Sequence, residues 1–272
     1  MAIKLMYITN EPQTACIVEQ SGVDRIFIDL EVRGKAERQG HVDSVKSHHT
    51  LDDINRMRDT LTKAELLVRT NALHEKSKQE IDEVVSRGAE IVMLPMWTSA
   101  DDARRFRDMV NGRARVMLLL ETIGAEHDID QLLVEDGFDE VHIGLNDLHL
   151  QYKMKFMFEL LANGKVDEIM AKLEAAGMFC GFGGVAGLNG GLISGRNVLT
   201  EHYRLKSQMA ILSRSFCDTS KTTNLDQLQQ IFNQGVKEMR DFEQFLTQQP
   251  AEYFEQNRLE VIRKVNEIVK GK

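Results

Sequence analysis

Short apolar runs alternate with amphipathic segments along most of the chain, and this alternation constrains the fold more than any other feature. Eight runs rich in Val, Ile, Leu and Met are expected to be β-strands, at residues 3–8, 25–30, 65–68, 90–94, 115–120, 140–143, 178–183 and 209–212. Runs such as VMLLL at residues 116–120 are apolar without interruption, which is typical of strands buried in a parallel sheet. Eight strand–helix units predict a closed (β/α)8 TIM barrel, and an open doubly wound sheet is the competing fold.

The segments between the strands have helical spacing. Helices are expected at residues 11–21, 51–61, 76–86, 99–110, 128–134, 154–161, 166–176, 197–205 and 224–246. Thr50 with Asp53 has the spacing of a capping box, and Ser99 with Asp102 opens the helix that follows the fourth strand. These helices complete the covering that a parallel barrel requires.

One more helix, at residues 252–269, follows the complete barrel. Its apolar stripe of Leu259, Ile262, Val265 and Val269 has no barrel surface assigned to it, and such a stripe usually marks an interface. We therefore expect a catalytic barrel domain at residues 1–250 and an oligomerisation helix at 251–272.

Composition and charge exclude several classes of partner. The net charge of −8 gives no indication of a nucleic-acid or anionic-membrane partner. No apolar run approaches the length of a membrane span, and the first ten residues, MAIKLMYITN, do not have the pattern of a signal peptide. The three cysteines have no metal-site spacing and are interpreted as reduced thiols. We expect a cytoplasmic protein.

Acidic side chains follow two successive buried strands. Glu121 comes directly after VMLLL, and Asp147 follows the next strand through Gly144-Leu145-Asn146, which we expect to be a tight turn. In a barrel all strand C-termini share one face, so these acids should meet the other strand-end residues, Asp29, Glu31, Arg69 and Trp97. Two carboxylates of this kind form a hard-ligand pair suited to Mg²⁺ or Mn²⁺. Two alternatives stay open: Asp147 as a helix cap and Arg69 as an ion-pair partner of Glu31 or Asp29.

Six motifs, in this order, resemble the HpcH/HpaI aldolase and citrate lyase β-subunit family. They are GVDRIFIDLE (22–31), VRTN (68–71), GAEIVMLPM (88–96), LLLET (118–122), GFDEVHIGLNDL (137–148) and GFGGVAG (181–187). The resemblance spans residues 3–216. It implies a (β/α)8 barrel that holds a divalent metal through Glu121 and Asp147. It also implies an oligomer, a trimer or hexamer, with an exchanged C-terminal helix.

The same resemblance implies how a substrate is held. Arg69 would face the keto-acid or acyl oxygen, and the backbone amides after Gly144 would bind the substrate carboxylate, with Asn146 and Asp147 beside it. Trp97 is as much a candidate for the substrate wall as for packing at the barrel mouth.

A carbon–carbon lyase uses residue types of this kind. Cleavage beside a carbonyl produces an enolate, which a Lewis-acid metal and a permanently charged guanidinium stabilise. No Lys stands at a strand end, so a Schiff-base mechanism lacks its nucleophile. We expect metal-dependent aldol cleavage or condensation of a 2-keto acid, pyruvate, with an aldehyde. A lyase of the malyl- or citramalyl-CoA type and a non-catalytic barrel subunit are the alternatives.

The chain departs from the family after its second strand. Pyruvate aldolases of the family usually have a His directly after the strand-end acid, whereas Val32 follows Glu31 here. The run DLE with Lys35 and Arg38 downstream favours the acyl-CoA branch.

An aldol step also needs a base, and His is the side chain best matched to neutral pH. His49, then His48 and then His41 are the candidates, because they leave the same strand end as Asp29 and Glu31. A water oriented by Glu31 is the alternative that uses no His. His142, inside a strand, is interpreted as structural.

Overall fold

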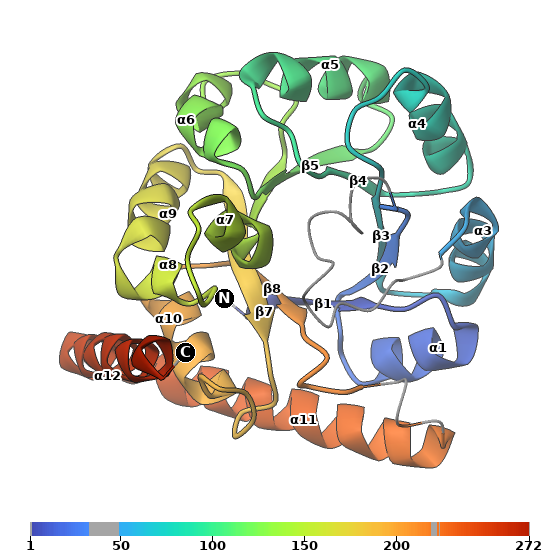
Figure 1. Cartoon of the computed structure of the whole chain (residues 1–272). Coiled ribbons are helices and arrows are strands. Elements are labelled where there is room, and N and C mark those ends of the chain that lie inside the picture. The colour runs from blue at the N-terminus through green and yellow to red at the C-terminus, as the bar shows by residue number, and fades with distance from the viewer. Residues whose placement is uncertain (1, 33–48, 219–221, 223, 272) are drawn as a thin grey trace.

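A computed structural model, which describes residues 2–32, 49–218, 222 and 224–271, contains eight parallel strands that close into a barrel (Figure 1). Each strand pairs with the next along the chain, and the last pairs with the first. The strands are β1 (Lys4–Ile8), β2 (Arg25–Asp29), β3 (Glu65–Arg69), β4 (Ile91–Leu94), β5 (Arg115–Leu120), β6 (Glu140–Ile143), β7 (Phe179–Val185) and β8 (Met209–Leu212). The predicted (β/α)8 barrel is confirmed.

Helices form a ring around this barrel (Figure 1). They are α1 (Pro12–Gln20), α3 (Leu51–Thr60), α4 (Ser77–Ser86), α5 (Ala100–Val110), α6 (Ile123–Leu132), α7 (Leu145–Gln151), α8 (Glu159–Ala162), α9 (Lys165–Ala175), α10 (Gly195–Arg204), α11 (Leu225–Leu246) and α12 (Ala251–Lys270). The two predicted helix starts are found. Asp53 accepts the Thr50 N–H at 2.7 Å, and the Ser99 hydroxyl accepts the Asp102 N–H at 3.2 Å.

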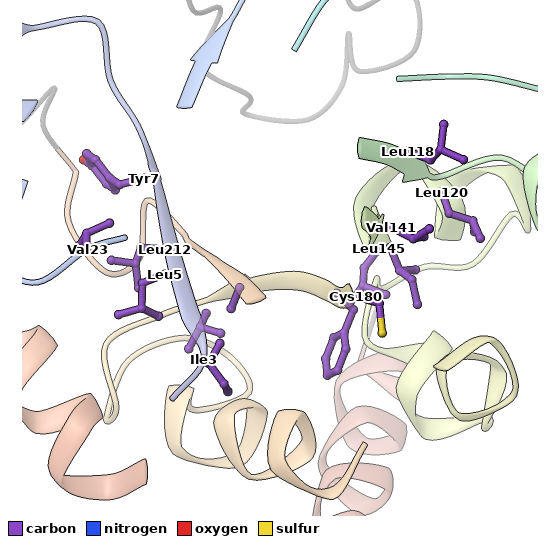
Figure 2. Close-up of a cluster of buried hydrophobic side chains, with 14 of the residues drawn as sticks. Ile3, Leu5, Tyr7, Val23, Leu118, Leu120, Val141, Leu145, Cys180 and Leu212 are labelled. Atoms are coloured by element: carbon purple, nitrogen blue, oxygen red, sulfur yellow. The ribbon is translucent and has the colours of Figure 1, made fainter. Parts of the chain in front are cut away.

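Side chains of the strands alternate between two apolar layers. Outward-facing residues such as Leu5, Leu118 and Val141 pack in the layer between the strands and the helices (Figure 2). Inward-facing residues fill the barrel itself, with Met6, Phe27, Leu67, Ile91, Met93, Met117, Leu119 and Met209 in one cluster. The barrel interior is therefore packed, and a cavity lies above this cluster, where the strands end.

Three helical segments differ from the prediction. Residues 145–146, expected as part of a tight turn, begin helix α7, and Asp147 lies in the first turn of that helix. Helix α6 begins at Ile123 instead of residue 128, because the Thr122 hydroxyl accepts the Ala125 N–H at 3.0 Å and caps the helix directly after Glu121. The helix expected at residues 154–161 is shortened to α8.

The C-terminal helix also differs from the prediction. Helix α12 packs against α8 and α10 (Figure 1), so the expectation that no barrel surface remained for it is wrong. Val261 and Val265 are buried, and Asn257 donates a hydrogen bond of 2.7 Å to Glu201 of α10. Leu259 on the same helix stays 54% exposed.

The remaining expectations concern cysteines and membranes. Cys16 is half-buried and Cys180 and Cys217 are buried, and all three are free thiols. Among the residues that the structure describes, no helix is long and apolar enough to cross a membrane.

Candidate active site

A cavity of about 840 Å³ lies at the C-terminal ends of the strands. Its charged wall is formed by Asp29 from β2, Arg69 from β3, Glu121 after β5 and Asp147 in α7. Its floor is the top of the inner apolar cluster, with Phe27, Met93, Leu119 and Ile211. The opposite wall, from the β1 and β8 ends, carries Tyr7, Asn10, Gln13, Ser213, Arg214 and Cys217. Closure of the barrel brings these distant segments together.

Arg69 is held in a fixed orientation by two carboxylates. Its Nε and Nη2 donate to the two oxygens of Asp29, each at 2.9 Å, and Nη2 lies 3.4 Å from Glu31. Burial by itself lowers the pKa of the guanidinium, but the negative charges of Asp29 and Glu31 outweigh it and raise that pKa above its usual range. The bidentate pair with Asp29 fixes the plane of the guanidinium group. Asp29 binds Nε and Nη2, so Nη1 is the remaining nitrogen that a ligand could bind.

Glu121 and Asp147 form a buried acidic pair. The two residues are 2% and 9% exposed, and the Met96 N–H donates to Glu121 at 3.0 Å. Burial and then the like charge of Asp147 raise the pKa of Glu121 to about 8, although the charge of Arg69 opposes them. Gly144 permits this arrangement, because a Cβ at that position would lie 2.8 Å from the Cβ of Glu121.

The acidic pair fits a divalent cation on electrostatic grounds. Two buried carboxylates repel one another, and a cation that binds both removes that repulsion. The described part of the chain contains no group of three or more His, Cys, Asp or Glu side chains that could hold a metal. Glu121 and Asp147 could serve as two protein ligands, with water and substrate completing the shell, as Mg²⁺ usually requires.

Of the three His candidates for the base, the structure brings His49 to the cavity. It stands two residues before α3, and its Nδ1 accepts the Asp29 N–H at 2.9 Å. His41 and His48 lie outside the described residues, as do Lys35 and Arg38.

Two predicted site residues lie behind the cavity wall. Glu31 is 3% exposed and reaches Arg69 from outside the cavity lining. Trp97 is 2% exposed and packs in the outer apolar layer, where its carbonyl accepts the Thr122 hydroxyl at 2.6 Å. The interpretation of Trp97 as a substrate wall is therefore wrong, because the chain turns at Met96, with a φ of 52°, before Trp97 enters the core.

His142 is a cavity residue that the sequence analysis interpreted as structural only. It lies on β6 two residues after Glu140, so both face the barrel interior, and its Nε2–H donates to the Gly183 carbonyl at 3.2 Å. Burial lowers the pKa of His142 to about 4, which keeps the ring neutral at pH 7. The alternation of β6 was the sequence signal for this position.

A family comparison addresses the same part of the chain. Residues 4–159 match the family described as HpcH/HpaI aldolase/citrate lyase, which is more than half of the chain. This chain belongs to the HpcH/HpaI aldolase/citrate lyase family. The matched range includes Asp29, Arg69, Glu121 and Asp147 of the cavity wall. Membership of the HpcH/HpaI family supports a lyase.

Solved structures of the HpcH/HpaI family share the fold at low sequence identity. An HpcH/HpaI aldolase from Desulfitobacterium hafniense DCB-2 aligns with a TM-score of 0.59 at 15% identity, over 83% of this chain and 92% of that one. An HpcH/HpaI aldolase/citrate lyase family protein from Burkholderia cenocepacia J2315 aligns with a TM-score of 0.60 at 13% identity, over 83% of this chain and 94% of that one. No curated protein matches the chain.

Proposed function

We propose that the chain is a divalent-metal-dependent carbon–carbon lyase that splits or joins a 2-keto acid, with pyruvate as the donor, and an aldehyde. The observation that carries this proposal is the grouping of a buried carboxylate pair, Glu121 and Asp147, and a fixed cation, Arg69, around one cavity. A barrel without catalytic activity has no use for a strained acidic pair of this kind, since the pair destabilises the fold.

Glu121 and Asp147 would hold Mg²⁺ or Mn²⁺. When bound, the cation supplies a Lewis acid to the keto and carboxylate oxygens of the substrate. Glu121 must be ionised to act as a ligand, and its pKa of about 8 means that it releases its proton at or slightly above neutral pH.

Arg69 stabilises the negative charge that develops on the substrate oxygen when the carbon–carbon bond breaks. Asp29 holds the guanidinium in place before substrate arrives, so little reorganisation is needed during the reaction. Gly144 and Asn146 line the neighbouring wall, and the backbone amides after Gly144 are our proposed contacts for the substrate carboxylate.

The cavity has room for a second substrate. Its volume of about 840 Å³ is larger than a three-carbon keto acid needs, and it extends to the wall formed by the β1 and β8 ends. The aldehyde would occupy this second part, beside residues such as Asn10, Gln13 and Ser213.

The test is exchange of the pyruvate methyl hydrogens for deuterium, followed by NMR with Mg²⁺ or Mn²⁺ present and then with a chelator. We expect metal-dependent exchange in the wild type and a loss of at least about 100-fold in Asp147→Asn. Asp241→Asn, on the exposed face of α11, is the matched control and should exchange at the wild-type rate. Exchange with an acyl-CoA ester and none with pyruvate would favour the acyl-CoA lyase, and no exchange with either would favour the non-catalytic barrel.

A further inference from the structure

The pairing of β2 with β3 ends at two residues of the cavity wall. The register closes at Asp29 and Arg69, and the Leu30 N–H then donates to the Arg69 carbonyl at 3.0 Å. In a parallel ladder the next donor on that side is two residues further along, at Val32, and its acceptor would be the Asn71 carbonyl. Here the Val32 N–H donates to the side-chain oxygen of Asn71, at 3.0 Å. The Asn71 side chain therefore adds one more hydrogen bond between the two strand ends.

Asn71 is itself held by α4, a helix of the outer ring (Figure 1). One oxygen of Glu80, in the first turn of α4, accepts the backbone N–H of Asn71 at 3.1 Å and its side-chain amide at 2.8 Å. The other oxygen accepts Nε2–H of His74 at 2.9 Å, while Nδ1 of that ring accepts the Lys76 N–H at 3.1 Å. Because a carboxylate only accepts, the Asn71 amide nitrogen must face Glu80, which leaves its oxygen for the Val32 N–H.

The strand end that Asn71 holds carries two groups that contact the Asp29–Arg69 pair. Directly before Val32, the Glu31 N–H donates to Oδ1 of Asp29 at 3.2 Å, and the same oxygen accepts Nε of Arg69 at 2.9 Å. The Glu31 carboxylate lies 3.4 Å from Nη2 of Arg69. Both contacts depend on where the Glu31 backbone lies, and a strand end with few remaining hydrogen bonds opens locally. The hydrogen bond at Val32 therefore stabilises the position of Glu31.

We propose that Asn71 and Glu80 are positioning residues for Arg69. Glu80 orients Asn71, Asn71 holds the end of β2, and the end of β2 keeps the Asp29–Arg69 pair in one orientation. The effect of this arrangement on the reaction rests on the proposed function. Both residues lie outside the cavity lining, so they act through Arg69 and do not touch the substrate. The alternative is a structural role confined to the loop before α4, and the following experiments separate the two.

Asn71→Ala removes the acceptor for the Val32 N–H and leaves the backbone N–H at position 71 on Glu80. We expect its kcat for pyruvate exchange, per folded molecule, to fall about 10- to 100-fold, the usual loss when a partner behind a site residue is removed. The KM for pyruvate should stay within about 2-fold of the wild-type value, because the charge that Arg69 stabilises develops in the transition state.

A second variant tests whether Glu80 acts through Asn71. Glu80→Ala should lower kcat by less than Asn71→Ala does, because the Asn71 side chain stays in place but is no longer oriented. The double variant should lose less kcat than the product of the two single losses. Losses that multiply would reject the proposed series of contacts. Glu83→Gln, which changes a carboxylate of the same helix that pairs with Arg87, is the matched control and should keep the wild-type kcat.

A further measurement needs no turnover. In ¹⁵N-arginine-labelled protein, the exchange of the Arg69 Nε–H with water reports how firmly Asp29 holds the guanidinium, and the signal is assigned by its absence in Arg69→Lys. We expect this exchange to be about 10-fold faster in Asn71→Ala than in the wild type, as when one supporting hydrogen bond is lost. Glu83→Gln should exchange at the wild-type rate. A structural role confined to the loop before α4 would leave the rate unchanged in every variant.

The outcomes separate this inference from the proposed function. An unchanged Nε–H rate in Asn71→Ala would reject the inference whatever the activity. A wild type that exchanges pyruvate, with the same kcat in Asn71→Ala, would reject the inference and leave the proposed function standing. A wild type that exchanges no pyruvate would reject the proposed function, and the Nε–H rate would still decide whether Asn71 and Glu80 hold Arg69.

Discussion

Glu121 shows how a site residue is kept at a cost to stability. Its pKa of about 8 in the folded protein lies above the unfolded value near 4.5, so the folded state retains a proton that the unfolded state releases. The stability that this proton contributes is fully present below about pH 4.5 and is lost as the pH rises through about 8. Without metal, the protein should therefore become less stable across that window.

We predict that Glu121→Gln flattens this dependence, because the amide stays neutral at every pH. At pH 9 and in the presence of a chelator, the variant should exceed the wild type in free energy of unfolding by on the order of a few kcal/mol. Urea denaturation at pH 5 and pH 9 measures the difference. The exposed Glu238→Gln is the control. An equal change in the free energy of unfolding between pH 5 and pH 9 in Glu121→Gln and in wild type would contradict the prediction.

Gly144 matters because the space beside it is too small for a side chain. Its φ of −82° is accessible to any residue, but an added Cβ would lie 2.9 Å from a carboxylate oxygen of Glu121. We expect Gly144→Ala to displace Glu121 and to weaken Mn²⁺ binding at least about 10-fold, as typical losses at metal-supporting positions are.

Isothermal titration with Mn²⁺ measures this effect. Gly187→Ala is the matched control, because no atom lies within 4 Å of its added Cβ. Unchanged Mn²⁺ affinity in Gly144→Ala would show that Glu121 is not a ligand or that it can move freely.

At the scale of elements, one face of helix α12 packs against its own chain, and one large apolar residue of the helix stays exposed. Val261 and Val265 are buried against the rest of the chain, whereas Leu259 is 54% exposed. The predicted homo-oligomer, a trimer or hexamer, would use this outer face of the helix.

We predict that Leu259→Glu lowers the oligomeric order in light scattering, since a charge at an apolar contact must be desolvated. Deletion from Ala251 onward should do the same, but it also uncovers α8 and α10, so the point variant is the cleaner test. Leu192→Glu, at a loop residue that is 69% exposed, is the control. If the mass of Leu259→Glu equals that of the wild type, α12 is not part of the interface.

At the scale of the whole molecule, the two ends of the barrel carry charges for different purposes. The end opposite the cavity is closed by Arg25, which pairs with Glu140 at 2.5 and 2.8 Å and with Glu65 at 2.8 Å. Lys4 and Arg115 complete the network. Every charge in it has a partner, in contrast to the repelling pair Glu121 and Asp147.

We therefore predict that Arg25→Met lowers the free energy of unfolding by about 3–5 kcal/mol, because the buried Glu140 loses its bidentate partner and is left with the more exposed Arg115. Activity per folded molecule should be unchanged, since the network lies at the other end of the barrel. Denaturant titration together with active-site titration measures both. Lys237→Ala, which removes an exposed pair with Asp241, should change neither. Loss of activity in folded Arg25→Met would contradict the separation of the two ends.

The number and order of the strands follow from local signals in the sequence, namely uninterrupted apolar runs and helix caps such as Ser99. The sequence also predicted that Arg69, Glu121 and Asp147 share one face, since closing a parallel barrel brings all strand C-termini to the same end. Helices α6 and α7 were mispredicted beside the site, where helical turns begin directly after Glu121 and Gly144 and the apolar pattern is too short to show them.

The contacts that these residues make depend on the tertiary structure. In the folded chain Trp97 packs in the core and Glu31 contacts Arg69. Helix α12 packs against α8 and α10, and the Asp29 N–H donates to Nδ1 of His49. None of these contacts follows from spacing along the chain, because each depends on packing between segments far apart in sequence. The pKa of Glu121 belongs to the same class, since burial and neighbouring charges arise only when the barrel closes.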